Sequence, residues 1–505
     1  MLRVLLIGAG TGYATKLVQV ICTVLLLPFL LSDGQLGLAA FGYFSTLQAI
    51  IAVLALTFDG WRQSTAKTTG NRVSAGGVSS RELGAMIGWS AAGVLVLAML
   101  AMLARWKIFS IGGLGIVDNI EVIFFLLLAQ VVIEQVLFPA EALLHATGNT
   151  WKINVTIAAE VVVRTTAIFA WFYTGVASLT VYAAIIFASA VARMLLFFVM
   201  SCGVLVPFSS VDKVASSKGG RATFRYSLAL LGGSVAEYLV FRMPVVVASR
   251  LVGAEAAAIL AVLLNSVPNY LRQLTLSVLR PMIIPLGARV DLSALSPVQQ
   301  VKLDALLSTH QFVACLVCVA AGATSWIWLD LWLGQDFASY SSHMNVLIIA
   351  IGLQIASAFQ MQLLVAQGWG RALAVGSIAL AAVTFVIMVV VVRQGPGLLL
   401  VLVAMHCTVL NGIVVKELFI RMKLSKGVAD SSRTGNMALV IACVCAAVIG
   451  YAMPATDGSE RLWLKSGIAI SEVVIVTLVC LRYVAPYYVI RDAYRAITSA
   501  ARVRS

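Results

Sequence analysis

The sequence predicts an all-α protein that crosses a membrane about fourteen times, and three observations support this. Of its 505 residues, 61% are hydrophobic and only 11% are charged, whereas soluble domains carry about 25% charged residues. The mean hydropathy is +1.00. The apolar residues form continuous runs of about 20, enough for one helical span each, and do not alternate as in a membrane barrel.

The spans can be placed in order along the chain. The N-terminal stretch is too long, and too polar in its middle, for a signal peptide, so it reads as a retained first helix. The expected spans begin near Val4, Leu36, Gly84, Ile120, Trp151, Val181, Ala222, Ala256, Asp304, Ser341, Arg371, Gly397, Met437 and Lys465.

Charge alternates between successive loops. One set of loops is basic, whereas the other is short and poor in positive charge, such as 32–35, 175–179 and 253–255. By the positive-inside rule, this pattern places both termini in the cytoplasm. It also explains the net charge of +14 without a nucleic-acid partner. The exceptions are Arg105, Lys107, Arg393, Arg461 and Lys465.

The chain divides into two pseudo-symmetric halves in this interpretation. Each half opens with a long helix that carries a central cation, Lys16 or Arg242, and a basic loop at 207–221 separates them. Transporters use such duplications to build a site at the repeat interface. The expected parts are an N-lobe of six spans (1–210), a cytoplasmic linker (211–222), a C-lobe of six spans (223–425), two further helices (436–486) and a basic tail (487–505).

Three spans carry polar stripes, each with one cation at middle depth. A charge at the bilayer centre costs about 2.5–3.5 kcal/mol on insertion scales, so it usually faces protein or water. The spacings place each set on one helix face. The stripes are Gly12, Lys16, Gln19 and Thr23; Ser227, Ser234, Tyr238, Arg242 and Ser249; and Asn265, Asn269 and Arg272.

Two interpretations of the cations remain open. Each could pair with a carboxylate on another helix, and Glu134, Glu160 and Glu237 are candidates. Alternatively, the three stripes share a hydrated central cavity of positive potential. Such a cavity attracts anions, and guanidinium matches phosphate oxygens in a bidentate manner. The expected ligand therefore carries phosphate or another anionic group.

Other charged residues lie near the ends of spans. Asp59 and Arg62 are spaced i, i+3, which favours a local salt bridge, with a gating role as the alternative. We expect Glu121, Glu141, Lys416 and Glu417 to reach the lipid headgroups by snorkelling.

No catalytic, cofactor or metal motif is evident. The sequence lacks a GxSxG, HExxH or Walker A pattern. The Cys315–Cys318 spacing has no second pair, so small buried side chains are expected there, not metal ligands.

Four stretches together resemble a known family. They are GYFSTLQAIIAVLALTFDGWRQSTAK (42–67), LLHATGNTWKINVTIAAEVVVR (143–164), RLVGAEAAAILAVLLNSVPNYLRQLTLSVLRPMIIP (250–285) and WIWLDLWLGQDFASYSSHMNVLII (326–349). They are similar to segments of the Wzx-type polysaccharide flippases of the MOP superfamily, which also holds lipid II flippases and MATE exporters. The likeness spans nearly the whole chain.

The resemblance implies a two-lobed bundle in which spans 1, 2, 7 and 8 line a central cationic cavity. It also implies transport of undecaprenyl-pyrophosphate-linked oligosaccharide across the bacterial inner membrane, alongside other polysaccharide-assembly proteins. Lys16 falls where related flippases place a first-span cation. This chain departs from many relatives in having Arg242 in span seven where they have an acid, with Glu237 nearby.

The expected function is therefore a flippase for O-antigen, capsule or exopolysaccharide repeat units, working by alternating access and without a cofactor. Lys16, Arg242 and Arg272 would hold the pyrophosphate, while Gln19, Asn265 and Asn269 would meet sugar hydroxyls. Asp59, Arg62 and Glu237 are the candidates for gating or coupling. The alternatives are a MATE-like exporter of organic cations, which needs acids in its cavity, and a membrane glycosyltransferase or polymerase, for which Asp118, Asp330 and Asp336 are the available external acids.

Overall fold

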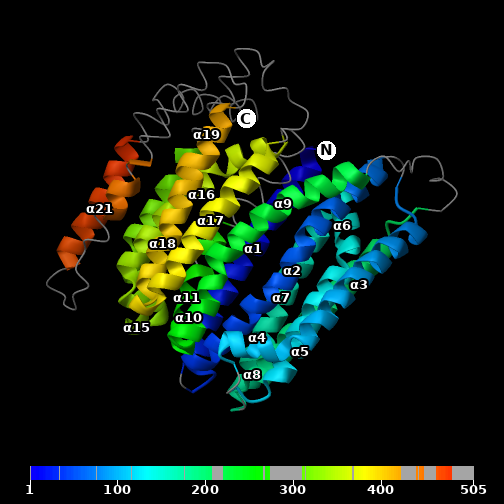
Figure 1. Ribbon diagram of the computed structural model, residues 1–505, viewed down its shortest axis with the longest axis horizontal. Helices are drawn as coiled ribbons and strands as arrows, with labels where there is room; N and C mark the ends of the chain where they lie inside the picture. Colours follow the sequence, from blue (N-terminus) through cyan, green and yellow to red (C-terminus); the bar gives the residue numbers. More distant parts are fainter. Residues whose placement is uncertain are drawn as a thin grey trace, which may run out of the picture. The chain divides into compact units, whose positions relative to one another are not determined.

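The computed structural model consists of helices joined by short turns, with no strand among the described residues (Figure 1). It describes residues 2–32, 34–74, 77–114, 117–175, 177–206, 220–265, 268–272, 310–312, 314–366, 369–421, 440–441, 443–448 and 462–479.

Within these residues, 11 helices are long and apolar enough to cross a membrane, or 12 if one bent pair counts as a single span. They begin close to the expected positions, which confirms the all-α, multi-pass prediction. The thirteenth expected span, near Met437, lies largely outside the described residues. The fourteenth contains a shorter apolar helix, Ser466–Leu478.

The chain forms two compact units. The first comprises Met1–Ser266 with Ala381–Pro396, and the second comprises Val267–Leu380 with Gly397–Ser505. The linker expected at 211–222 lies mostly outside the described residues, and the tail expected at 487–505 lies wholly outside them. The assignment of spans to two six-helix lobes stays a prediction.

The first unit holds the N-terminal helices. They are α1 (Leu2–Leu31), α2 (Gly37–Ser74), α3 (Ser80–Leu103), α4 (Arg105–Gly112), α5 (Ile120–Val136), α6 (Phe138–Ala146), α7 (Thr150–Tyr173), α8 (Leu179–Cys202), α9 (Gly220–Phe241), α10 (Met243–Leu251) and α11 (Ala254–Asn265), with the short helix η3 (Val392–Gln394).

Helix α2 is the element around which the first unit packs, because α5, α6, α9, α10 and α11 all contact it. Its approach to α11 depends on Gly42. A Cβ atom added at Gly42 would lie 1.9 Å from the carbonyl oxygen of Ala254. Small residues are used in this way to bring membrane helices close together. On the same helix, Phe44 and Leu47 are also buried.

Two spans of the first unit are broken, and a proline lies just beyond each break. Helix α6 follows α5 after Leu137 and has Pro139 in its first turn, while α10 follows α9 after Arg242 and has Pro244 there. Proline has no N–H to donate and disfavours helical backbone in the preceding residue, so it fits a helix start better than a helix interior. Hydrogen bonds hold the second broken span in place, since Tyr238 donates to the carbonyl of Ala49 (3.0 Å) and Ser249 to that of Gly112 (2.9 Å).

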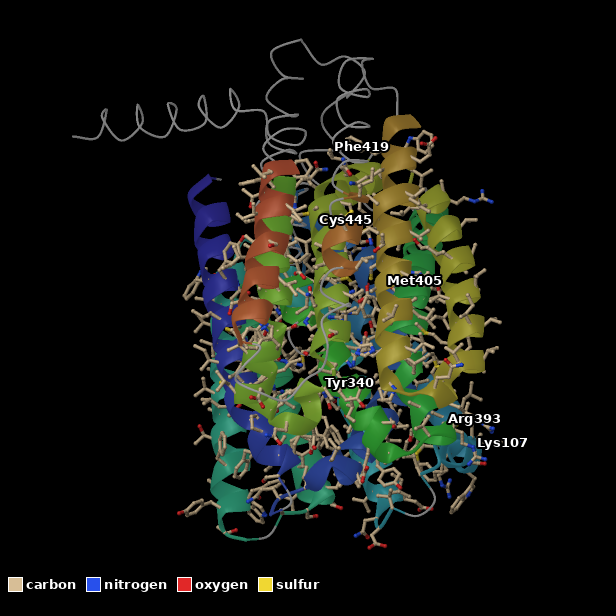
Figure 2. The ribbon with its side chains drawn as sticks, turned by 90° about the vertical axis from the view of Figure 1, so that its left-hand side faces the viewer. Lys107, Tyr340, Arg393, Met405, Phe419 and Cys445 are labelled. Atoms are coloured by element: carbon tan, nitrogen blue, oxygen red, sulfur yellow. The ribbon has the colours of Figure 1, made fainter. Side chains whose placement is uncertain are left out.

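The second unit is built around α16. Within its span Ser341–Met361, 83% of the residues in the 18-residue apolar window are buried, a larger share than in any other described span. In Figure 2, Tyr340 lies before one end of α16, Met405 lies on α18, and Phe419 lies towards the opposite end of the unit. The labelled elements of this unit are α14 (Ser325–Leu333), α15 (Gln335–Ala338), α16 (Ser341–Ala366), α18 (Pro396–Val409), η4 (Leu410–Val414), α19 (Val415–Arg421) and α21 (Leu462–Val479); the division between the units falls within α17 (Gly370–Val391).

Side-chain hydrogen bonds accompany two irregularities in the second unit. The helix His310–Ala323 bends by 59° into α14, and at the bend the hydroxyl of Thr324 donates to the carbonyl of Ala320. Bonds of this kind compete with the helical ladder and bend helices. At the π-helical turn η4, Asn411 donates to the carbonyl of Cys407 (2.9 Å).

Candidate functional site

The polar stripe of the first span lies on one helix face, as the sequence predicts. Lys16 Nζ donates to Gln19 Oε1 at 2.9 Å, and Thr23 donates to the backbone carbonyl of Gln19. Both Lys16 and Gln19 are half-buried. The cation therefore has a neutral amide oxygen among its hydrogen-bond partners.

The neighbouring positions of α1 attach it to α7. Asn154 Nδ2 donates to the hydroxyl of Thr11 (3.0 Å), while the hydroxyl of Thr15 donates to the carbonyl of Asn154 (2.8 Å). A Cβ atom at Gly12 would lie 3.6 Å from Asn154 Nδ2. These contacts fix the rotation of α1 and thereby the direction of its polar stripe.

Arg242 occupies the break between α9 and α10. Its N–H donates to the carbonyl of Tyr238 (2.9 Å), and its own carbonyl accepts from the N–H of Val245 (3.2 Å). The side chain is half-buried and close enough to interact electrostatically with the Tyr238 phenol. Glu237 is exposed. A cation at a helix break can draw on backbone groups that a continuous helix would use internally.

The third stripe continues beyond α11. Asn265 is the last residue of α11, and the helix resumes over 268–272. There Arg272 Nη2 donates to Asn269 Oδ1 at 3.1 Å, and all three side chains are half-buried. Like Lys16, Arg272 has an amide oxygen beside it.

The three cations belong to different units. Lys16 and Arg242 lie in the first unit, and Arg272 lies in the second. The third stripe is itself divided, with Asn265 in the first unit and Asn269 in the second. Their convergence on one cavity therefore stays a prediction.

Two acids that sequence reasoning offered as partners for these cations are bound elsewhere. Glu134 Oε1 lies 2.6 Å from Arg193 Nη2, and Glu160 Oε2 lies 3.3 Å from Arg193 Nη1. The other oxygen of Glu160 lies 2.8 Å from Arg164. The alternative in which Glu134 and Glu160 pair with the cationic stripes is therefore not supported, because Arg164 and Arg193 bind these two acids.

These four residues form a charged ladder across three spans. Glu134 lies on α5, Glu160 and Arg164 on α7, and Arg193 on α8. The side chain of Glu160 is only 5% exposed, and Gln130 adds a hydrogen bond to Glu134. Two acids balance two bases, so the ladder carries no formal net charge. Sequence reasoning missed Arg193, although an arginine inside an apolar run is itself a signal of a functional or paired group.

In the C-terminal half of α2, Arg62 lies close to an acidic residue on another helix. Arg62 Nη2 lies 4.0 Å from Glu141 Oε2, and His145 Nε2 lies 3.8 Å from the other Glu141 oxygen. The guanidinium also lies over the ring of Phe138, 4.5 Å from its centroid. Glu141 is therefore partnered within the protein, not directed to headgroups as expected. The side chain of Asp59 lies outside the described residues, so its expected bridge to Arg62 stays a prediction.

The second unit buries ionisable groups that sequence reasoning did not select or placed at the surface. Glu472 on α21 is 0% exposed, and Asn345 on α16 donates to its carboxyl group. Lys416 on α19 is 3% exposed, which corrects the expectation that it snorkels to the headgroups. Its Nζ has no hydrogen-bond partner among the described residues, and Cys315 and Cys443 are its electrostatic neighbours.

The described residues contain no cluster of histidine, cysteine or acidic side chains that could hold a metal ion. Cys315 and Cys318 are each 1% exposed, in keeping with the small buried side chains predicted there. A shallow apolar groove of about 710 Å³ on the second unit is bordered by Trp369 and Arg371.

Comparison with known proteins identifies the fold. No family model matches the sequence, and no curated protein matches it. Among solved structures, the chain is similar to the lipid II flippase MurJ in an inward closed conformation, with a TM-score of 0.60 and 10% identity over 94% of this chain and 99% of MurJ. The chain therefore shares the fold of this flippase structure.

A second structure agrees. The eukaryotic MATE transporter AtDTX14 is similar with a TM-score of 0.51 and 14% identity, over 86% of this chain and 97% of that one. Both proteins are MOP superfamily members, so the chain shares its fold with members of that superfamily. At these identities the likeness establishes the fold alone, and the narrower Wzx-type resemblance stays a prediction.

Proposed function

We propose that this chain is a flippase that moves an undecaprenyl-pyrophosphate-linked oligosaccharide across the bacterial inner membrane, with both termini in the cytoplasm. The MOP-type fold supports transport, and the first solved structure compared above is named as a lipid II flippase. The substrate class rests on the intramembrane charges.

One observation carries the proposal. Arg193 and Arg164 hold Glu134 and Glu160, so these acids are not available to the cationic stripes. Lys16 and Arg272 donate hydrogen bonds to the amide oxygens of Gln19 and Asn269. An amide oxygen accepts a hydrogen bond and so orients the cation, but it carries no formal charge of its own, and this supports a role of these cations toward an anionic headgroup.

In this proposal each residue has a defined role. Lys16, Arg242 and Arg272 bind pyrophosphate oxygens, and the two guanidinium groups can do so in a bidentate manner. Gln19, Asn265 and Asn269 meet sugar hydroxyls. The lipid chain stays in the bilayer while the transporter alternates between its inward and outward states about a fixed site.

Asp59, Arg62 and Glu237 remain the proposed gating or coupling residues. The contact of Arg62 with Glu141 supports a gate, since it joins α2 to α6 through charges that can separate. A MATE-like exporter of organic cations is less well supported, because the paired acids of the ladder are engaged by arginines.

The test uses purified full-length protein in proteoliposomes with a fluorescently labelled undecaprenyl-pyrophosphate oligosaccharide. Arg242→Glu and Arg272→Glu should each lower the flipping rate by at least about tenfold, the effect of losing one charge-assisted bond of about 1.5–3 kcal/mol. Arg393→Glu is the matched control, because this exposed arginine lies on η3, outside the three stripes. Normal flipping by both stripe variants would refute the proposal, and efflux of an organic cation from the same vesicles would favour the MATE-like alternative.

A further inference from the structure

Glu472 lies in the middle of an apolar helix and is completely buried. It is the only acidic or basic residue between 466 and 478, and its exposed fraction is 0%. Both of its carboxyl oxygens lie 3.2 Å from the same atom, Nδ2 of Asn345 on α16. Asn345 is itself 3% exposed. One amide nitrogen therefore serves a group that can accept several hydrogen bonds.

No ion pair to Glu472 is present in the described part of the chain. On α16 the group that contacts Glu472 is Asn345, and Gly322 of the helix His310–Ala323 lies against Asn345. Three other titratable groups of this unit have described neighbours away from Glu472: His343 lies against Gly397, Lys416 neighbours Cys315 and Cys443, and a ring nitrogen of His310 lies 2.9 Å from the carbonyl oxygen of Ile355. An ionised carboxylate in such surroundings is costly, whereas a protonated one is not.

The partner of Glu472 can serve both protonation states. Asn345 Oδ1 is buried and has no hydrogen-bond partner among the described residues. With the amide as placed, Nδ2 donates to a carboxylate. After a half-turn of the amide, Oδ1 would accept from a protonated carboxyl group. Once Glu472 is protonated, its O–H can therefore donate a hydrogen bond to Asn345 Oδ1, which otherwise has no partner among the described residues.

Gly322 provides the space for the amide in this arrangement. A Cβ atom added at Gly322 would lie 2.8 Å from Asn345 Oδ1 and 3.1 Å from its backbone oxygen. Any larger residue would therefore press on the amide and oppose its rotation.

We propose that Glu472 and Asn345 form a proton-binding site that couples transport to proton movement. This inference rests on the proposed transport function, and it deepens that function by naming the coupling ion. The carboxylate takes one proton from water on one side of the membrane when the α16–α21 contact opens. It releases that proton to the other side later in the cycle, and no other bond forms or breaks.

A purely structural role would also explain a buried glutamate–asparagine contact between two helices. Glu472→Gln separates the two roles, because glutamine keeps the size and hydrogen-bonding capacity of a protonated glutamate but cannot release a proton. If the contact is only structural, Glu472→Gln should leave transport and its response to pH unchanged. If Glu472 binds and releases a proton, the response to pH should be lost.

Two measurements on the reconstituted full-length chain form the test. In the first, infrared difference spectra across a pH step should show the C=O band of a protonated buried carboxyl. The band should be absent in Glu472→Gln, shifted in frequency in Asn345→Leu and unchanged in the exposed control Glu255→Gln. In the second, an imposed pH gradient should change the rate at which labelled undecaprenyl-pyrophosphate oligosaccharide is flipped by the unaltered chain and by Glu255→Gln, but not by Glu472→Gln.

The outcomes separate this inference from the proposed function. Arg242→Glu should lower the flipping rate at least about tenfold, as proposed above, yet leave the infrared band unchanged. In the unaltered chain, an infrared band without any flipping of the labelled lipid would contradict only the substrate assignment. A missing band in the unaltered chain, or a full response to the pH gradient in Glu472→Gln, would overturn the proton site while leaving the flippase proposal intact. If Glu472→Gln does not accumulate in the membrane, the infrared measurement on Asn345→Leu replaces it. A carboxyl band at the same frequency in Asn345→Leu as in the unaltered chain would overturn the inference.

Discussion

Arg193 Nη2 on α8 lies 2.6 Å from Glu134 Oε1 on α5. The same guanidinium reaches Glu160 on α7, so one arginine joins three spans of the first unit. In a membrane, where helices gain little from the hydrophobic effect, polar contacts of this kind hold the bundle in register.

Removing Arg193 should destabilise the first unit strongly. Arg193→Met leaves Glu134 and Glu160 with only Arg164 to balance them, and breaking a buried ion pair by removing one partner costs about 3–5 kcal/mol. The apparent melting temperature of the detergent-solubilised protein should fall sharply. The double variant Arg193→Met with Glu134→Gln should recover part of the loss, whereas Arg393→Met should have no effect. Equal melting temperatures for Arg193→Met and Arg393→Met would contradict the ladder.

Gly42 should be intolerant of even one added methyl group. Because the Cβ of Gly42→Ala would lie 1.9 Å from the Ala254 carbonyl oxygen, α2 and α11 would have to separate. Overpacking of this kind costs about 1–3 kcal/mol. Gly70→Ala is the control on the same helix, since nothing lies within 4 Å of the Cβ position there. Thermal unfolding should show a loss for Gly42→Ala and no loss for Gly70→Ala; the reverse order would mean that the helices do not meet at Gly42.

Replacing Lys416 with an apolar residue should raise stability. Its Nζ is buried without a hydrogen-bond partner among the described residues, and burying an unpaired amine costs more than burying a thioether of similar length. Lys416→Met should therefore increase the melting temperature, while the exposed Lys107→Met should leave it unchanged. A clear decrease for Lys416→Met would show that Nζ has a stabilising partner.

The sequence was sufficient to locate the membrane-spanning helices and to predict which polar residues share one face of a helix. Hydropathy alone locates the long helices, because each needs a continuous apolar run. The Lys16–Gln19 contact also follows from helical spacing, since residues three apart share a face.

Contacts between helices were beyond the sequence. Glu134 and Arg193 are 59 positions apart, and whether they meet depends on the rotation of two helices that hydropathy does not specify. The same applies to Glu141. Its position near the end of a span predicts that it reaches the headgroups, but in the structure its side chain on α6 lies close to that of Arg62. Glu472 could have been selected from the sequence, because a lone acid in an apolar run signals a functional group.

The central claim is that the intramembrane cations bind an anionic headgroup, and lipid binding tests it most directly. Native mass spectrometry of the purified protein would compare undecaprenyl pyrophosphate with uncharged undecaprenol. We expect the unaltered chain to prefer the pyrophosphate lipid by about 100-fold or more, given about 1.5–3 kcal/mol for each charge-assisted hydrogen bond, and the triple variant Lys16→Gln, Arg242→Gln, Arg272→Gln to lose that preference. Equal binding of the two lipids by the unaltered chain, or an undiminished preference in the triple variant, would contradict the claim.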